Sequence, residues 1–258
     1  MKRVLVFDSG VGGLSVLDAI AAVGVPVVMD YAADNAWLPY GDKSDGAVRA
    51  RVPTLLLSLV DRLAPDLIVL ACNTASTIAL EAVREAVALP IVGVVPPIKP
   101  AAAATRSGVI GLLATPATVM RAYTDDLIAR FAANVRVVRF GSTALVEAAE
   151  AKLAGRAVDG AAITDAIAGL FGVAAEIDVV ALACTHFPLL QEELAAAAPR
   201  QTLWLSSGAA IARRAAELLH LKLGGCARCE RVLLTGAVIA ERAFRARGFH
   251  EIASAPVT

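Results

Sequence analysis

Short runs of apolar, β-branched residues alternate along the chain with longer segments in which Ala and Leu recur at helical spacing among charged residues. This alternation is typical of βα units built around a parallel sheet. The pattern predicts an α/β fold in which mostly parallel sheets are flanked by helices. We expect a helix over residues 209–221 and strands over residues 4–7, 26–29, 67–71, 91–94, 109–113, 135–140, 179–183, 203–205 and 232–234.

One strand pattern occurs twice. Residues 66–74, DLIVLACNT, reappear as residues 178–186, DVVALACTH. Each copy has an acidic residue, a buried strand and then a cysteine, Cys72 or Cys184, at the carboxyl end of the strand. The offset of 112 residues (184 − 72) is near half of the 258-residue chain. Such a repeat predicts two pseudo-symmetric α/β lobes that arose by duplication.

The two crossovers between the lobes are expected near Val95 and Ser206. The first lobe would then be discontinuous, with residues 1–95 plus 207–258, and the second lobe would hold residues 96–206. Ligands of open parallel sheets bind beyond the carboxyl ends of the strands, where both cysteines are expected. If the lobes face each other, the sequence predicts an active site in the cleft between them.

Composition and charge exclude several classes of protein. The 24 basic and 24 acidic residues cancel, so the positive surface that nucleic-acid binding requires is not expected. Apolar runs are strand-sized, and the start of the chain lacks the apolar region of a signal peptide. We therefore expect a soluble, cytoplasmic protein with no membrane or nucleic-acid partner, whose four cysteines are reduced thiols.

Two thiols at equivalent strand ends suit the inversion of a carbon centre. In a two-base reaction one group removes a proton from one face of the carbon while an acid on the other face supplies one. Nearby charged groups can tune the thiols. The candidates are Asp8 for Cys72 and His186 for Cys184, with Glu147 and Asp34 as further auxiliary groups that follow strands in their respective lobes.

Each auxiliary group also has a plain structural interpretation. Asp8 could cap the following helix, and His186 could be a core histidine. Glu147 and Asp34 could be solvated carboxylates at helix starts. The glycine-rich residues 8–13 lack the spacing of a nucleotide-binding loop and are expected to hold a carboxylate or an amine. The lone C-x-x-C of residues 226–229 is weak as a zinc or redox motif, and no metal site is expected.

Five segments together resemble a known family. They are residues 8–14 (DSGVGGL), 33–41 (ADNAWLPYG), 71–76 (ACNTAS), 113–118 (LATPAT) and 184–188 (CTHFP). In this order and spacing they are similar to the aspartate/glutamate racemase superfamily, and within it to the glutamate racemases. The match extends over almost the whole chain.

The resemblance implies interconversion of L- and D-glutamate without a cofactor, to supply D-glutamate for peptidoglycan, with Cys72 and Cys184 as the catalytic thiols. It also implies that glutamate is the substrate partner and that the chain can form a homodimer. Auxiliary acid/base roles fall on Asp8, Asp34, Glu147 and His186. The expected substrate-binding residues are Asp8, Ser9, Pro39, Tyr40, Gly41, Asn73, Thr74, Thr115, Thr118, Thr185 and His186.

Two positions depart from the family pattern or leave it open. Ala117 stands where many members carry glycine, which bears on the geometry of the loop between Thr115 and Thr118. Glu150 lies three residues after Glu147, so one helical turn could present either carboxylate to the second thiol. The context of residues 145–147, LVE, favours Glu147.

Three other functions are compatible with parts of this pattern. A sister racemase acting on aspartate or a hydantoin would use the same paired thiols on a different substrate. A non-catalytic binding protein that resembles periplasmic receptors could have two lobes, but it would need neither cysteine. A cysteine hydrolase needs one nucleophile and leaves the second thiol unexplained.

Overall fold

The computed structural model describes residues 1–254 and divides into two compact units. Unit 1 consists of Met1–Val94 together with the chain from Gly208 onward, and unit 2 is Val95–Ser207. Residues 255–258, which the sequence assigned to the first lobe, lie outside the described residues.

Unit 1 is built on a parallel sheet. Within the described residues this sheet has six strands in the order β10-β9-β2-β1-β3-β4, and every neighbouring pair is parallel. The strands are β1 (Lys2–Asp8), β2 (Val27–Ala33), β3 (Leu67–Leu70), β4 (Ile91–Gly93), β9 (Arg228–Leu234) and β10 (Glu251–Ser254). Both faces of such a sheet must be covered, which explains the near-continuous apolar runs of its central strands.

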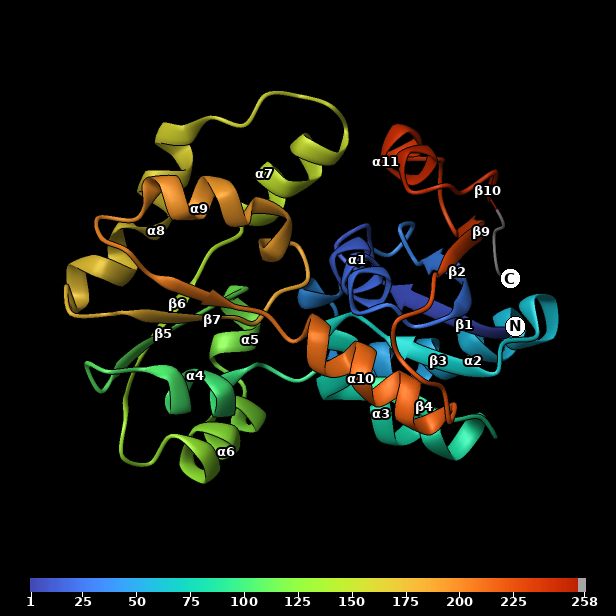
Figure 1. Ribbon diagram of the computed structural model, residues 1–258, viewed down its shortest axis with the longest axis horizontal. Helices are drawn as coiled ribbons and strands as arrows, with labels where there is room; N and C mark the ends of the chain where they lie inside the picture. Colours follow the sequence, from blue (N-terminus) through green and yellow to red (C-terminus); the bar gives the residue numbers. More distant parts are fainter. Residues whose placement is uncertain (255–258) are drawn as a thin grey trace. The chain divides into compact units, whose positions relative to one another are not determined.

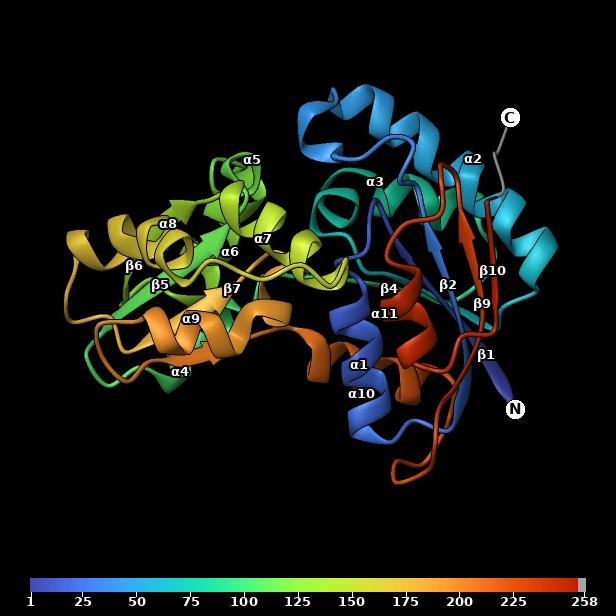
Figure 2. The same ribbon diagram turned by 90° about the horizontal axis from the view of Figure 1, so that it is seen from above.

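Helices cover both faces of this sheet. Helices α2 (Asp45–Leu63) and α3 (Asn73–Ala86) pack on one face, and α1 (Leu14–Val23), α10 (Gly208–Leu218) and α11 (Glu241–Ala246) lie on the other, as Figure 2 shows. The core under α2 and α3 contains Cys72 and Tyr40 among its buried residues. A short 3₁₀ helix, η1 (Tyr40–Asp42), leads toward α2.

Unit 2 repeats the inner part of this arrangement. Its parallel sheet has the order β6-β5-β7-β8 in the part of the chain described. The strands are β5 (Val109–Ala114), β6 (Arg136–Gly141), β7 (Val179–Leu182) and β8 (Leu203–Leu205). This order matches β2-β1-β3-β4 of unit 1 strand for strand, so Cys72 after β3 and Cys184 after β7 occupy equivalent places.

The helices of unit 2 also form two layers. Helices α7 (Ala144–Leu153), α8 (Gly160–Val173) and α9 (Gln191–Ala197) cover one face, while α4 (Ile98–Ala104) and α6 (Ala122–Phe131) cover the other (Figure 1). Two short helical turns, α5 (Pro116–Val119) and η2 (Phe187–Leu190), follow β5 and Cys184. The predicted α/β class with two parallel sheets flanked by helices is confirmed.

Three strand assignments from the sequence were incomplete, and one of them is β9, which begins at Arg228 rather than at Val232. Strand β2 continues through Ala33 rather than ending at Met29, because Asp30 is fully buried inside the sheet and pairs with Arg3 (2.8 Å) and Arg231 (2.7 Å). A charge paired in this way interrupts the apolar pattern without interrupting the strand. Strand β10 was not predicted, since its four residues are mostly exposed.

Candidate functional site

The first half-site lies at the carboxyl ends of three neighbouring strands in unit 1. Asp8 ends β1, Asp34 follows β2 and Cys72 follows β3. The ends are held level by backbone hydrogen bonds, from Asp34 N to Asp8 O (3.0 Å) and from Ala71 N to Phe7 O (2.7 Å). The parallel register therefore gathers residues that are 26 to 64 positions apart in the sequence (34 − 8 and 72 − 8) at one edge of the sheet.

Cys72 is a buried thiol at the start of α3. Its Sγ accepts a hydrogen bond from Ala75 N (3.5 Å) and lies 3.5 Å from the hydroxyl oxygen of Ser9. Burial, together with the charge of nearby Asp8, raises the pKa of the Cys72 thiol to about 12. Cys72 is thus a protonated thiol at neutral pH, suited to supply a proton.

Asp8 organises the glycine-rich segment that follows β1. Its Oδ1 accepts hydrogen bonds from Ser9 N (2.6 Å) and Gly10 N (3.4 Å), whereas α1 begins after Gly13 with no side-chain cap. A Cβ at Gly13 would lie 2.8 Å from the Tyr31 hydroxyl and 3.0 Å from Asp8 Oδ2. Glycine at this position therefore lets the backbone pass close to both Asp8 and the Tyr31 hydroxyl.

The first turn of α3 carries two further polar side chains, Asn73 and Thr74, both buried. Asn73 Oδ1 has no hydrogen-bond partner among the described residues. A buried amide oxygen without a partner costs about 1–3 kcal/mol. A ligand group with N–H donors, such as an ammonium, would recover that cost at this position.

The segment Pro39–Gly41 enters the first half-site through η1. Pro39 is exposed, Gly41 is half-buried, and the Tyr40 ring is buried in the same core as Cys72. The Tyr40 hydroxyl donates to Asp34 (2.7 Å), which is also paired with Arg51 (2.6 Å). Asp34 was expected as an auxiliary acid or base, but the structure engages it in this ion pair.

The second half-site lies at the matching strand ends of unit 2. Thr115 follows β5, Ser142 follows β6 and Cys184 follows β7. The backbone bonds that align the ends recur here, from Ser142 N to Ala114 O (3.0 Å) and from Ala183 N to Leu113 O (2.8 Å).

Cys184 is the first member of a chain of three polar side chains. Its Sγ lies 3.8 Å from His186 Nδ1, and His186 Nε2 lies 2.8 Å from Glu150 Oε1 on α7. Cys184 and His186 are buried, and the Glu150 side chain is 25% exposed. An imidazole between a thiol and a carboxylate can accept the thiol proton while the carboxylate stabilises the resulting imidazolium.

This geometry favours Glu150 over Glu147. Glu147 lies one helical turn earlier on α7 and is exposed, and the contact with His186 is made by Glu150. The sequence context LVE had favoured Glu147. The choice depends on how α7 is rotated about its axis, which the local sequence does not encode.

Thr115 and Thr118 are joined at one turn after β5. Their hydroxyl oxygens lie 2.9 Å apart, and Thr118 N donates to Thr115 O (3.0 Å). Ala117 lies inside the helical turn α5 without a positive φ, so this turn does not require glycine there. Thr185, directly after Cys184, is also buried.

The remaining two cysteines differ from this pair. Cys226 is exposed, while Cys229 is half-buried, and burial together with the charge of Asp18 raises its pKa to about 11. Among residues 1–254, no group of three or more His, Cys, Asp or Glu side chains is arranged to hold a metal ion. No helix in the same range is long and apolar enough to cross a membrane.

Comparison with known proteins assigns the family. The model of the Asp/Glu/hydantoin racemase family matches residues 15–215. The chain is 55% identical over 217 residues to a glutamate racemase of Sphingopyxis alaskensis, covering 83% of this chain and 81% of that protein. A glutamate racemase of Pectobacterium carotovorum is 51% identical over 216 residues, covering 84% and 76%.

Solved structures agree with this assignment. The crystal structure of Escherichia coli glutamate racemase in complex with L-glutamate and the activator UDP-MurNAc-ala superposes with a TM-score of 0.88 at 42% identity, covering 97% of both chains. A glutamate racemase isoform from Bacillus anthracis gives 0.83 at 26% identity, covering 100% and 99%. The chain belongs to the Asp/Glu/hydantoin racemase family, and the resemblance found in its motifs is confirmed.

Proposed function

We propose that this family member is a glutamate racemase, an isomerase that interconverts L- and D-glutamate by proton transfer at the α-carbon and so supplies D-glutamate for peptidoglycan. The observation that carries the proposal is the pair of buried thiols, Cys72 and Cys184, at equivalent strand ends of two matching sheets. Relatives at 50–55% identity carry the name glutamate racemase, and the Escherichia coli structure contains L-glutamate.

In the proposed reaction the two thiols act in opposite senses. The Cys184 thiolate, formed when His186 takes the thiol proton, removes the α-proton of one enantiomer, and Glu150 stabilises the imidazolium. The Cys72 thiol then gives its proton to the opposite face of the carbanion. The α-carbon is inverted, Cys184 ends as the thiol and Cys72 as the thiolate, and the same steps reversed convert the other enantiomer.

Polar groups around each thiol would bind the charged ends of the substrate. The unpaired Asn73 Oδ1 suits the α-ammonium group. Hydroxyl and backbone N–H donors suit the two carboxylates. In this proposal the donors come from Ser9, the backbone N–H groups of Tyr40 and Gly41, Thr74, Thr115, Thr118 and Thr185, while Pro39, which has no N–H, contributes contact only.

Location and assembly belong to the same proposal. Catalysis by two free thiols requires a reducing compartment, which supports a cytoplasmic enzyme. Formation of a homodimer, implied by the family resemblance, stays a prediction that the mass of the purified protein in solution will test.

The test is loss of optical activity from L-glutamate and, in parallel, from L-aspartate, without any added cofactor. We expect turnover of glutamate only, and we expect the variants Cys72→Ser and Cys184→Ser each to lose at least about 100-fold, since removal of either acid/base group stops inversion. Turnover of aspartate alone would identify a sister racemase. Glutamate binding without turnover would point to the binding-protein alternative.

A further inference from the structure

The buried carboxylate of Asp34 joins three segments of unit 1 next to Tyr40. The Asp34 side chain is 0% exposed. Its Oδ2 accepts hydrogen bonds from the Tyr40 hydroxyl (2.7 Å) and Arg51 Nε (2.6 Å). Its Oδ1 accepts from Arg51 Nη2 (2.8 Å) and Thr235 Oγ1 (2.7 Å). We call these four residues the Asp34 network.

The network holds Asp34 as an anion whose oxygens are occupied. Burial alone would raise the pKa of this carboxyl, but hydrogen bonds from the three donor side chains outweigh burial and hold the pKa below its ordinary value. Arg51 binds both oxygens in a two-pronged arrangement, the strongest geometry for such a pair. Asp34 therefore serves as a fixed acceptor rather than as a group that gains and loses protons.

Tyr40 is correspondingly restricted to donating its hydroxyl proton. Burial and the adjacent Asp34 carboxylate raise the pKa of the phenol well above its ordinary value. Because Tyr40 begins η1, fixing its hydroxyl also fixes the direction of Pro39–Gly41. Arg51 stabilises this loop through a second contact, a cation–π interaction in which its guanidinium lies 4.5 Å from the centre of the Trp37 ring.

Thr235 connects this loop to the end of β9. Its hydroxyl donates to Asp34 and accepts from Ala36 N (3.1 Å). Beside it, Gly236 N donates to Asn35 Oδ1 (2.8 Å). The segment that follows β9 is thereby fastened to the segment that follows β2, although about 200 residues separate them in sequence.

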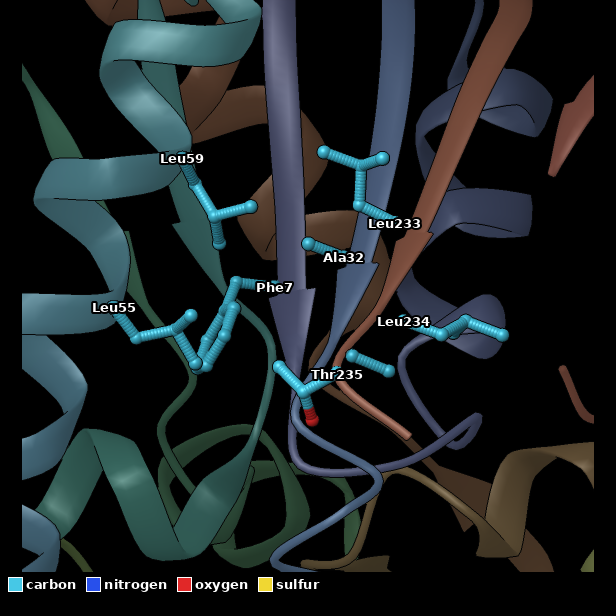
Figure 3. A pocket seen from close by; sticks show the side chains of 8 residues that line it. Phe7, Ala32, Leu55, Leu59, Leu233, Leu234 and Thr235 are labelled. Atoms are coloured by element: carbon cyan, nitrogen blue, oxygen red, sulfur yellow. The ribbon is translucent and has the colours of Figure 1, made fainter. Parts of the chain in front are cut away.

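Apolar side chains shield one side of Thr235 from water. They line a gap too narrow for a water molecule, and Figure 3 shows the Thr235 hydroxyl at one end of it. The lining residues are Phe7, Ala32, Ala33, Leu55, Leu59, Leu233 and Leu234. Water cannot readily replace the Thr235 hydroxyl from this side, and Thr235 itself is half-buried, so removing the hydroxyl takes away one of the donors to Asp34.

We propose that Arg51 and Thr235 are positioning residues for substrate binding, acting through Asp34 and Tyr40 to hold the Pro39–Gly41 segment in its binding conformation. This inference rests on the proposed racemase function, in which that segment binds glutamate. Neither residue touches the thiols in this scheme, so their loss should weaken binding more than proton transfer.

The test compares the kinetics of Thr235→Val, which keeps the shape but removes the hydroxyl, with those of Thr235→Ser, which keeps the hydroxyl. We expect T235V to raise KM for glutamate about tenfold while kcat changes less than about threefold, and T235S to restore KM. Arg51→Lys, which keeps the charge but cannot bind both oxygens, should raise KM in the same way. Thr54→Val, an exposed threonine on α2, is the matched control.

The outcomes separate this inference from the proposed function. A wild-type protein that does not racemise glutamate overturns the function and the inference together. An active wild type with an unchanged KM in T235V, or with kcat falling as KM rises, overturns the positioning role alone. If T235V does not fold, as judged by its thermal transition, R51K and Tyr40→Phe must show the KM effect, and failure in both overturns the inference.

Discussion

At the residue scale, the two thiols sit in different chemical surroundings. Cys72 lies beside a hydroxyl and a carboxylate, and its pKa is raised to about 12. Cys184 lies beside His186, which can take its proton. The thiols therefore differ in their neighbours, and in the proposed reaction Cys72 acts first as the acid and Cys184 as the base.

The raised pKa of Cys72 predicts its alkylation behaviour. Only the thiolate reacts, so the rate for Cys72 should rise about tenfold per pH unit from pH 7 to 10, without levelling off near the reference value of about 8.5. The measurement is iodoacetamide labelling read peptide by peptide, with exposed Cys226 in the same digest as the reagent control. A plateau for Cys72 below pH 9 would contradict the assignment of Cys72 as the resting acid.

The contact between His186 and Glu150 predicts which carboxylate serves Cys184. Glu150→Gln should lower kcat by about 10- to 100-fold, because a neutral amide cannot stabilise the imidazolium. Glu147→Gln, on the same helix one turn earlier, should have the smaller effect. The measurement is initial rates in both directions, and a larger loss in E147Q would restore the interpretation drawn from the sequence.

The sequence predicted the positions of some site residues but not of others. The strand-end rule applied to the sequence located Cys72, Asp8 and Cys184 where the structure has them. Thr235 obeys the same rule, because it is a polar residue directly after β9. Arg51 could not be found in this way, because nothing local to α2 indicates that its side chain reaches a buried carboxylate.

At the element scale, the acidic residue before each repeated strand has a shared structural purpose. Asp66 accepts hydrogen bonds from Arg3 N (2.8 Å) and Lys2 Nζ (2.6 Å) at the start of β1. Asp178 accepts from the backbone of Arg106 (2.8 Å) and Ser107 (3.1 Å) just before β5. Both carboxylates fasten the beginning of the neighbouring strand, which explains why the acidic residue recurs with the cysteine.

Asp178 predicts a pH-dependent contribution to stability. Burial acts to raise the pKa of its carboxyl, but hydrogen bonds from Thr105 and the following backbone lower it to about 2. Because the folded pKa is lower than the unfolded value near 3.9, the stabilisation is present above pH 4 and is lost between pH 4 and 2. Asp178→Asn should lower the free energy of unfolding by about 1–2 kcal/mol at pH 7.

Urea unfolding of D178N and wild type at several pH values is the measurement. The two midpoints should converge as the pH falls from 4 toward 2. Asp165→Asn, an exposed position on α8, is the control and should match wild type at neutral pH. Equal midpoints for D178N and wild type at pH 7 would contradict this role.

Elements were predicted well where the apolar pattern was unbroken, as in β5, β7 and β8. The pattern was less informative where a buried ion pair entered a strand, as Asp30 does in β2, or where a short strand lay at the sheet edge, as β10 does. In both cases the stabilising partners are distant in sequence, so a local window of residues does not contain the information.

At the scale of the whole molecule, the two sheets share one strand order, as the repeated sequence pattern predicts. Unit 2 keeps the four strands that the repeat requires, and unit 1 adds β9 and β10 from the returning chain. Each unit carries one buried strand-end thiol with its own polar neighbours, so a reaction that uses two such thiols needs both units. The account therefore requires that both thiols act on one α-carbon.

The most direct test of that requirement is the origin of the proton in early product. L-glutamate is incubated with the enzyme in D₂O, and the reaction is stopped while only a few per cent of the substrate has been converted. The two enantiomers are then separated, and the deuterium content of each is measured by mass spectrometry. Two thiols acting from opposite faces predict D-glutamate with deuterium at the α-carbon, while the remaining L-glutamate keeps its protium. Deuterium entering L-glutamate as fast as D-glutamate forms, or D-glutamate that keeps the original proton, would contradict the two-thiol account.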